Sequence, residues 1–195
     1  MANRLRTAKM SYGILIIIAF IFTMVALFTP GWRSYKGEGA PFFGLITLDC
    51  GNGVRYVARP DCHEWFRYKA TFEKVALGCM IVAALLEFIC VISFCLLLSK
   101  ARYRLAAPAA GMCALAALLI AIAVIWYAVR FDTKTTYMQS SRYEMVHQAH
   151  LGYSWYLAIV AFIFTLLAAA AAGATSSLGI VDTRPPEVHH HHVNA

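Results

Sequence analysis

Four long stretches of the chain are almost free of charged residues, and each is long enough to cross a lipid bilayer. They cover residues 10–31, 75–99, 105–129 and 151–181. A hydrocarbon layer of about 30 Å is crossed by about 20 apolar residues in a helix. Within that layer only helices or closed barrels satisfy every backbone N–H and C=O group. The sequence therefore predicts an all-α transmembrane bundle of four helices.

Composition excludes a soluble globular domain. Hydrophobic residues make up 61% of the chain and charged residues only 14%, which would leave a soluble protein with a very large apolar surface. The net charge of +7 comes from basic residues beside the spans. Anionic lipid headgroups are the expected partner of these residues, and we expect no nucleic-acid site.

The orientation of the spans depends on where the basic residues lie. Arg4, Arg6 and Lys9 precede the first span, and three more cations fall within residues 100–104, which lie on the same side. Residues 32–74 hold seven cations, mixed with acidic residues, so a raw count leaves the orientation open. The charge density near the span ends favours cytoplasmic termini. The extracellular segments would then be a first loop at residues 32–74 and a second loop at 130–150. The cytoplasmic segments would be a head at 1–9, a turn at 100–104 and a tail at 179–195, with the fourth span at 151–178.

Two of the six cysteines, Cys50 and Cys62, are the only pair in a polar loop. A disulfide between them would persist on the extracytoplasmic side, and the alternative is two free thiols. The other four lie in apolar spans, where a cysteine is most often a small buried hydrophobe. They are Cys79, Cys90, Cys95 and Cys113.

The first loop carries patterns of local structure. Residues 42–50 and 54–59 favour β-strands and are separated by Gly51-Asn52-Gly53, which predicts a hairpin of two strands. Trp65, Tyr68 and Phe72 have i, i+3, i+7 spacing, which predicts a short surface helix that continues into the second span.

Several motifs together resemble the first-loop signature of the superfamily of claudins, peripheral myelin proteins and channel γ-subunits. The signature residues are Trp32, Gly44, Leu45, Cys50 and Cys62. Segments 111–127 and 152–157 are similar to the third and fourth spans of claudins. The resemblance implies a left-handed four-helix bundle topped by a small extracellular antiparallel sheet, with the disulfide joining neighbouring strands and Trp32 near the membrane face.

The chain departs from the claudin pattern at two points. Ile46 stands where the second signature tryptophan is found, and the interval from Gly44-Leu45 to Cys50 is one residue longer than usual. The basic head followed by residues 28–32 is similar to the nematode Clc-like branch of claudin-like proteins.

Glu87 is the one ionisable side chain near the middle of a span. A charge there is costly unless it pairs, protonates or meets water. One interpretation is a protonated or hydrogen-bonded carboxyl that faces hydroxyls such as Thr23 or Thr165. The other is a contact with a partner membrane protein.

Small residues in the third and fourth spans favour packing within the bundle, with contact between copies as the alternative.

The sequence gives no pattern of an enzyme, and we expect no catalytic residue, cofactor or metal. The histidines are spread over both sides of the membrane, which is unlike a di-iron enzyme, and no Cys-x-x-Cys motif is present. The histidines are His63, His147, His150 and residues 189–192.

Two functions fit the resemblance. The first is a role in cell-cell contact, adhesion or a paracellular barrier at the plasma membrane, and the second is an auxiliary subunit of an ion channel or receptor. If the protein forms a paracellular barrier, charged loop residues would set its ion selectivity through the local potential. The other interpretation of these residues is an ordinary solvated surface. The candidates are Lys36, Asp49, Arg55, Arg59, Asp61 and Glu64.

Overall fold

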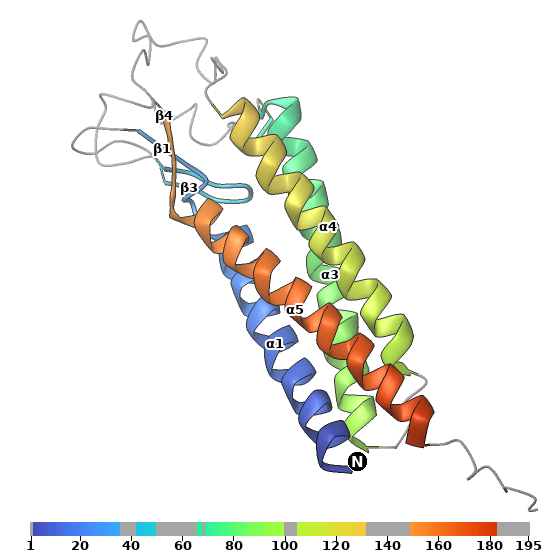
Figure 1. Ribbon diagram of the computed structural model, residues 1–195. Coiled ribbons are helices and arrows are strands. Elements are labelled where there is room, and N and C mark those ends of the chain that lie inside the picture. Colours follow the sequence, from blue (N-terminus) through green and yellow to red (C-terminus); the bar gives the residue numbers. More distant parts are fainter. Residues whose placement is uncertain are drawn as a thin grey trace, which may run out of the picture.

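The protein is a bundle of four long helices with a small sheet at one end (Figure 1). The structure, a computed structural model, describes residues 2–35, 42–49, 66–67, 69–99, 105–131 and 149–182. The helices are α1 (Ala2–Phe28), α3 (Thr71–Ser99), α4 (Ala106–Arg130) and α5 (Tyr153–Asp182). Each contains a stretch long and apolar enough to cross a membrane. The predicted bundle of four membrane helices is confirmed.

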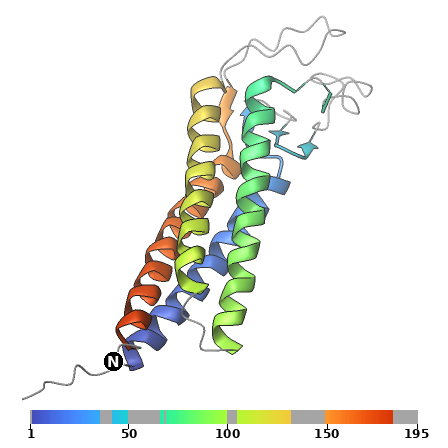
Figure 2. The same ribbon diagram turned by 90° about the vertical axis from the view of Figure 1, so that its right-hand side faces the viewer.

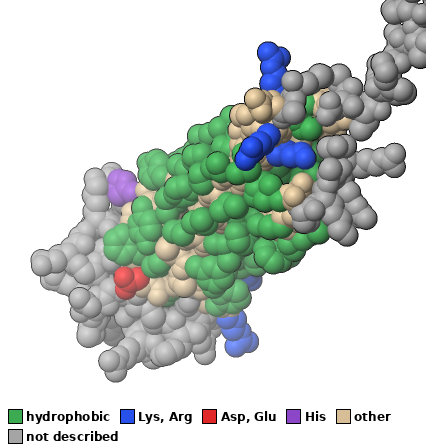
Figure 3. Space-filling model, turned by 90° about the horizontal axis from the view of Figure 1, so that it is seen from below, with side chains coloured by type: hydrophobic (Ala, Val, Ile, Leu, Met, Phe, Trp, Pro, Cys, Tyr) green, Lys and Arg blue, Asp and Glu red, His purple; other side chains and the backbone are tan. Residues whose placement is uncertain are grey.

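The helices bury small residues and turn large apolar ones outward. In α4 the buried positions recur every three or four residues and include Ala109, Cys113 and Ala116, while Leu118, Ile125 and Val129 are exposed. In Figure 3 a broad band of hydrophobic side chains covers the face of the bundle, with charged side chains at its margins. Small interior residues let helix backbones approach closely, which is the usual basis of helix association in lipid.

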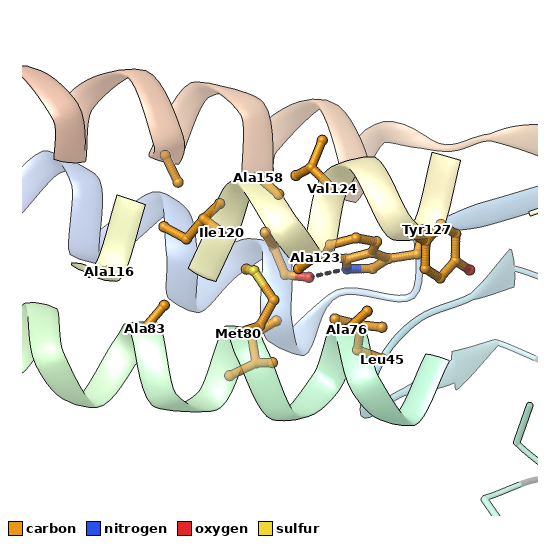
Figure 4. Packing of buried hydrophobic residues seen from close by; sticks show 14 of the residues in the cluster. Leu45, Ala76, Met80, Ala83, Ala116, Ile120, Ala123, Val124, Tyr127 and Ala158 are labelled. Carbon is orange, nitrogen blue, oxygen red and sulfur yellow. Dashed lines mark hydrogen bonds between the residues drawn. The ribbon is translucent and has the colours of Figure 1, made fainter. Parts of the chain in front are cut away.

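The interior contains two clusters of buried residues. The cluster nearer the sheet includes Met80 of α3 and Ile120 of α4, which lie between the helices in Figure 4. The cluster nearer the other end is built around Tyr12 and Phe94, whose rings meet edge to face with centroids 6.0 Å apart. A Cβ atom on Gly13 would lie 2.0 Å from the Phe94 ring, so only glycine leaves room for this ring.

The sheet has four short antiparallel strands in the order β3-β2-β1-β4. They are β1 (Arg33–Tyr35), β2 (Phe42–Phe43), β3 (Leu48–Asp49) and β4 (Ala149–Leu151). Ser34 of β1 is opposite Phe42 on one side and His150 on the other. Strand β1, one of the two inner strands, therefore pairs with two segments that are far apart in the sequence. The sheet lies at one end of the helices, which we call the sheet end of the bundle (Figure 2). The small antiparallel sheet implied by the resemblance is confirmed.

The first loop differs in detail from the sequence prediction. Residues 42–49 do not form one strand, because the Gly44 N–H donates to the Thr47 carbonyl at 2.9 Å and the chain reverses between β2 and β3. Phe72 lies in the first turn of α3, which begins at Thr71, and Phe66 and Arg67 form a turn. Trp65, Tyr68 and the predicted strand at 54–59 lie outside the described residues.

Candidate functional site

Trp32 connects the sheet to the helices. Its side chain is fully buried, and its Nε1 donates to the Ala26 carbonyl of α1 at 2.7 Å. Its ring meets the ring of Tyr127 of α4, which is labelled in Figure 4, at 5.0 Å between centroids. The Trp32 backbone N–H donates to the Phe43 carbonyl at 2.9 Å, and its carbonyl accepts from the Gly152 N–H at 3.1 Å. One residue thus contacts α1, β2, α4 and the segment that enters α5.

The backbones around Gly31 and Gly152 approach each other closely. The Ser154 N–H donates to the Gly31 carbonyl at 2.8 Å, and the hydroxyls of Thr29 and Ser154 are 2.6 Å apart. A Cβ atom on Gly152 would lie 2.4 Å from the Gly31 carbonyl oxygen, so this approach requires glycine. Two segments that resemble claudins, the signature around Trp32 and residues 152–157, are therefore in direct contact.

Gly44 and Leu45 form the tight turn between β2 and β3. Leu45 is fully buried in the cluster that contains Trp32. A Cβ atom on Gly44 would lie 2.6 Å from the Thr29 carbonyl oxygen, which places this turn against the end of α1. Ile46, at the position of the second signature tryptophan, is partly buried and packs against the same cluster.

A group of buried charged side chains lies beside the signature residues. Arg33 and Glu73 are 1% and 2% exposed, with Nη2 and Oε1 3.9 Å apart, and the Arg33 guanidinium lies 5.5 Å from the centroid of the Phe72 ring. The Lys69 ammonium donates to the Leu45 carbonyl and, at 3.4 Å, to that of Gly44. Burial lowers the pKa of Lys69 to about 8, against the opposing effect of the nearby Glu73 carboxylate.

Sequence reasoning did not find this group, because a buried cation in a loop looks the same in a sequence as a solvated one. Two signals were present. Arg33 directly follows the signature Trp32, and Glu73 stands four residues after Lys69.

The depressed pKa of Lys69 predicts how stability changes with pH. The pKa of Lys69 is about 8 in the folded protein, against 10.5 for an ordinary lysine side chain, so the stabilisation linked to this group is fully present above pH 10.5 and is lost as the pH falls to 8. Compared with Lys69→Met, the wild-type free energy of unfolding should therefore rise between pH 8 and 10.5, by at most about 1.4 kcal/mol per pH unit.

Denaturant unfolding in detergent at several pH values measures this difference. Lys69→Arg is the matched control, because its guanidinium stays charged throughout this range. A difference between wild type and Lys69→Met that stays constant with pH would contradict the prediction.

Glu87 lies in the interior of the bundle, where it faces two hydroxyls from other helices. Its side chain is fully buried, and its Oε1 is 2.6 Å from Thr165 Oγ1 of α5. Thr165 Oγ1 is also 2.7 Å from the Ala161 carbonyl oxygen. Glu87 Oε2 and Thr23 Oγ1 of α1 have no hydrogen-bond partner among the described residues. These contacts agree with a hydrogen-bonded carboxyl, and the side chain has no exposed surface to offer a partner protein.

Of the candidate selectivity residues, the structure describes only Asp49, which is exposed on β3 at the edge of the sheet. The other five, together with Cys50 and Cys62, lie outside the described residues: Lys36, Arg55, Arg59, Asp61 and Glu64. In the described part of the chain, no group of three or more His, Cys, Asp or Glu side chains could hold a metal ion. His150 is in β4, and the other histidines are not described.

Comparison with known proteins gives one clear result. Residues 1–184 match the model of a family described as "Tight junction protein, Claudin-like", and no curated protein matches the chain. The matched range includes all four helices and all four strands. It also includes Trp32, Gly44 and Leu45, and the two glycines whose backbones approach each other, Gly31 and Gly152. With four membrane helices and a sheet fixed to one end of them, this chain belongs to the claudin-like family.

Proposed function

We propose that this claudin-like membrane protein acts at the plasma membrane in cell-cell contact, as part of an adhesive structure or a paracellular barrier. The description of its family supports this role. The observation that carries it is the attachment of the sheet to the bundle, through the backbone and indole hydrogen bonds of Trp32. Such an attachment gives the sheet a fixed orientation over the membrane, as contact with neighbouring molecules requires.

In this proposal the sheet end is extracellular and both termini are cytoplasmic. Figure 1 shows the N-terminus and the end of α5 at the end of the bundle opposite the sheet. Arg4 and Arg6 are exposed on the first turns of α1 at that end, which agrees with the tendency of cations to stay on the cytoplasmic side.

We also propose that Cys50 and Cys62 form a disulfide in the extracellular loop. The loop position and the resemblance to the first-loop signature support this pairing. Peptide mapping of the unreduced protein tests it. Two free thiols at these positions would contradict both the pairing and the extracellular placement of the loop.

Charged residues of the sheet and its loop would set the ion preference of a paracellular path. Asp49 is the best candidate, because it is exposed on an edge strand. Two unit charges about 4 Å apart interact by about 1 kcal/mol in water. Loss of this one interaction corresponds to at most about fivefold, so Asp49→Asn should lower the ratio of cation to anion permeability by about two- to fivefold, and Asp49→Lys, which reverses the charge, should lower it further.

Epithelial monolayers that express the tagged protein test both the function and this residue. The proposal expects a continuous belt at cell borders, a changed transepithelial resistance and a shift of the dilution potential in Asp49→Lys. Arg4→Glu reverses an exposed charge at the other end of α1 and should leave the dilution potential unchanged.

The competing function is that of an auxiliary subunit of an ion channel or receptor. It predicts that the protein copurifies with a channel and alters its currents, while the resistance of the monolayer stays the same. That result would overturn the barrier proposal.

A further inference from the structure

Two cysteine thiols meet in the interior of the bundle, where the proposed junctional role makes no use of them. Cys90 of α3 and Cys113 of α4 are both fully buried and free, and their Sγ atoms are 3.2 Å apart. The Cys113 thiol donates to the Cys90 sulfur, and the Cys90 thiol donates to the Ala109 carbonyl at 3.6 Å. These contacts place both sulfurs between two helices that run side by side (Figures 1 and 2).

The geometry is close to that of a disulfide. A disulfide has an S–S distance of about 2.05 Å, so the two sulfurs have to approach by about 1 Å more. Both side chains already point toward each other from neighbouring helices. A lone buried thiol is normally inert, but here each thiol has a second one within reach.

We propose that Cys90 and Cys113 form a reversible oxidation site, with a lipid hydroperoxide as the oxidant. Both sulfurs are fully buried between helices that span the membrane, so they are closed to water and lipid alike in the packed bundle. An oxidant has to come through the hydrocarbon layer and between the helices, which favours one that dissolves in that layer over hydrogen peroxide. Cys90 reacts first and Cys113 second, because the Cys113 thiol donates its hydrogen bond to the Cys90 sulfur and is therefore already aimed at it.

The reaction has two steps. The Cys90 sulfur bonds to the terminal oxygen of the hydroperoxide as the O–O bond breaks, and the leaving alkoxide takes the Cys90 thiol proton, which gives a sulfenic acid and the lipid alcohol. The Cys113 thiol then attacks the Cys90 sulfur and displaces water, forming the Sγ–Sγ bond. Together the two thiols lose two hydrogen atoms, and the hydroperoxide becomes an alcohol and water. A dithiol reductant reverses the bond. The oxidised protein has α3 linked to α4 through a covalent bond.

The primary sequence provides a direct assay for this bond. Cys113 is the only cysteine after Arg104, and trypsin cleavage at Lys74, Lys100, Arg104 and Arg130 separates peptide 105–130 from peptide 75–100. A disulfide between these two peptides therefore must include Cys113.

The experiment uses the full chain in liposomes treated with cumene hydroperoxide, an organic hydroperoxide that enters the bilayer. Free thiols are then blocked, the protein is digested, and the peptides are analysed by mass spectrometry without reduction. We expect peptides 75–100 and 105–130 to be joined, with the loss of two hydrogens, in most molecules. Dithiothreitol should separate them. An equal concentration of hydrogen peroxide should give at least several-fold less of the joined peptide.

Two variants locate the bond. Cys90→Ala should abolish the joined peptide, whereas Cys95→Ala, which removes the exposed thiol of the same helix, should leave it unchanged. Both variants are first compared with wild type by size-exclusion chromatography, and Cys90→Ser replaces Cys90→Ala if that variant does not fold. The proposal is overturned if wild type gives no joined peptide or if the peptide persists without Cys90. If cumene hydroperoxide and hydrogen peroxide give equal amounts of the joined peptide, the assignment of a lipid hydroperoxide as the oxidant is overturned.

Discussion

Replacement of Trp32 by alanine should lower the thermal midpoint of the detergent-solubilised protein by about 10 °C. Truncation of a buried tryptophan costs about 3 to 5 kcal/mol. In a chain of this size, each kcal/mol shifts the midpoint by about 2 to 4 °C. The change also leaves the Ala26 carbonyl without its indole donor and removes the ring against Tyr127. Reaction of the buried thiols with a fluorescent maleimide during heating measures the midpoint.

Two further variants separate the causes of this effect. Trp32→Phe keeps an aromatic ring but loses the indole N–H, so its loss should be close to that of one buried hydrogen bond, about 1 to 3 kcal/mol. Trp126→Ala removes a tryptophan that is 45% exposed on the surface of α4 and should change the midpoint little. Equal shifts for Trp32→Ala and Trp126→Ala would show that Trp32 does not hold the sheet to the bundle.

Glu87→Ala should be nearly as damaging, whereas Glu87→Gln should be tolerated. The reason lies in the count of protons at Thr165. Its hydroxyl carries one hydrogen but lies 2.6 Å from Glu87 Oε1 and 2.7 Å from the Ala161 carbonyl. One hydrogen cannot make two short, straight hydrogen bonds, so we infer that Glu87 carries a proton, which it donates to Thr165 while Thr165 donates to Ala161. We therefore expect a neutral carboxylic acid.

Glutamine can replace this acid because its amide N–H donates in the same direction. Glu87→Gln should stay within about 1 kcal/mol of wild type, while Glu87→Ala should lose about 2 to 5 kcal/mol through a cavity and broken hydrogen bonds. Thr165→Val, a variant of similar shape, should lose about 1 to 3 kcal/mol because it removes the hydrogen-bond partner of Oε1 of the buried acid.

Infrared spectroscopy tests the protonation state itself. The wild-type protein should show the carbonyl stretch of a protonated carboxylic acid at neutral pH, and this band should be missing in Glu87→Gln. A wild-type spectrum without the band would contradict the assignment even if all the stabilities followed the expected order.

The parts of the fold that the sequence revealed are those with a local physical cause. The four helices were predictable because a membrane sets a minimum length of apolar residues. Glu87 stood out because ionisable side chains inside spans are rare. Trp32 and Gly44-Leu45 were identified by resemblance, and the structure adds the reason for them: a close approach of the backbones at the sheet end.

Other features depend on contacts between distant residues and leave no local signal. Strands β1 and β4 are three residues long, too short for an alternating pattern to be recognised. The turn at Gly44 divides a β-favouring run that looks continuous in the sequence. The contact between Cys90 and Cys113 depends on the rotation of α3 and α4 relative to each other, which hydrophobicity all around a helix does not specify.

The pairing of β1 with β4 sets an order of events during synthesis. Ser34 and His150 are opposite each other although 116 positions separate them in the chain. A ribosome completes β1 long before it reaches β4, so this strand has an unpaired edge until the last helix has been inserted. Nascent chains that stall before residue 149 would expose that edge, and an unpaired strand edge is a surface on which chains aggregate or bind chaperones.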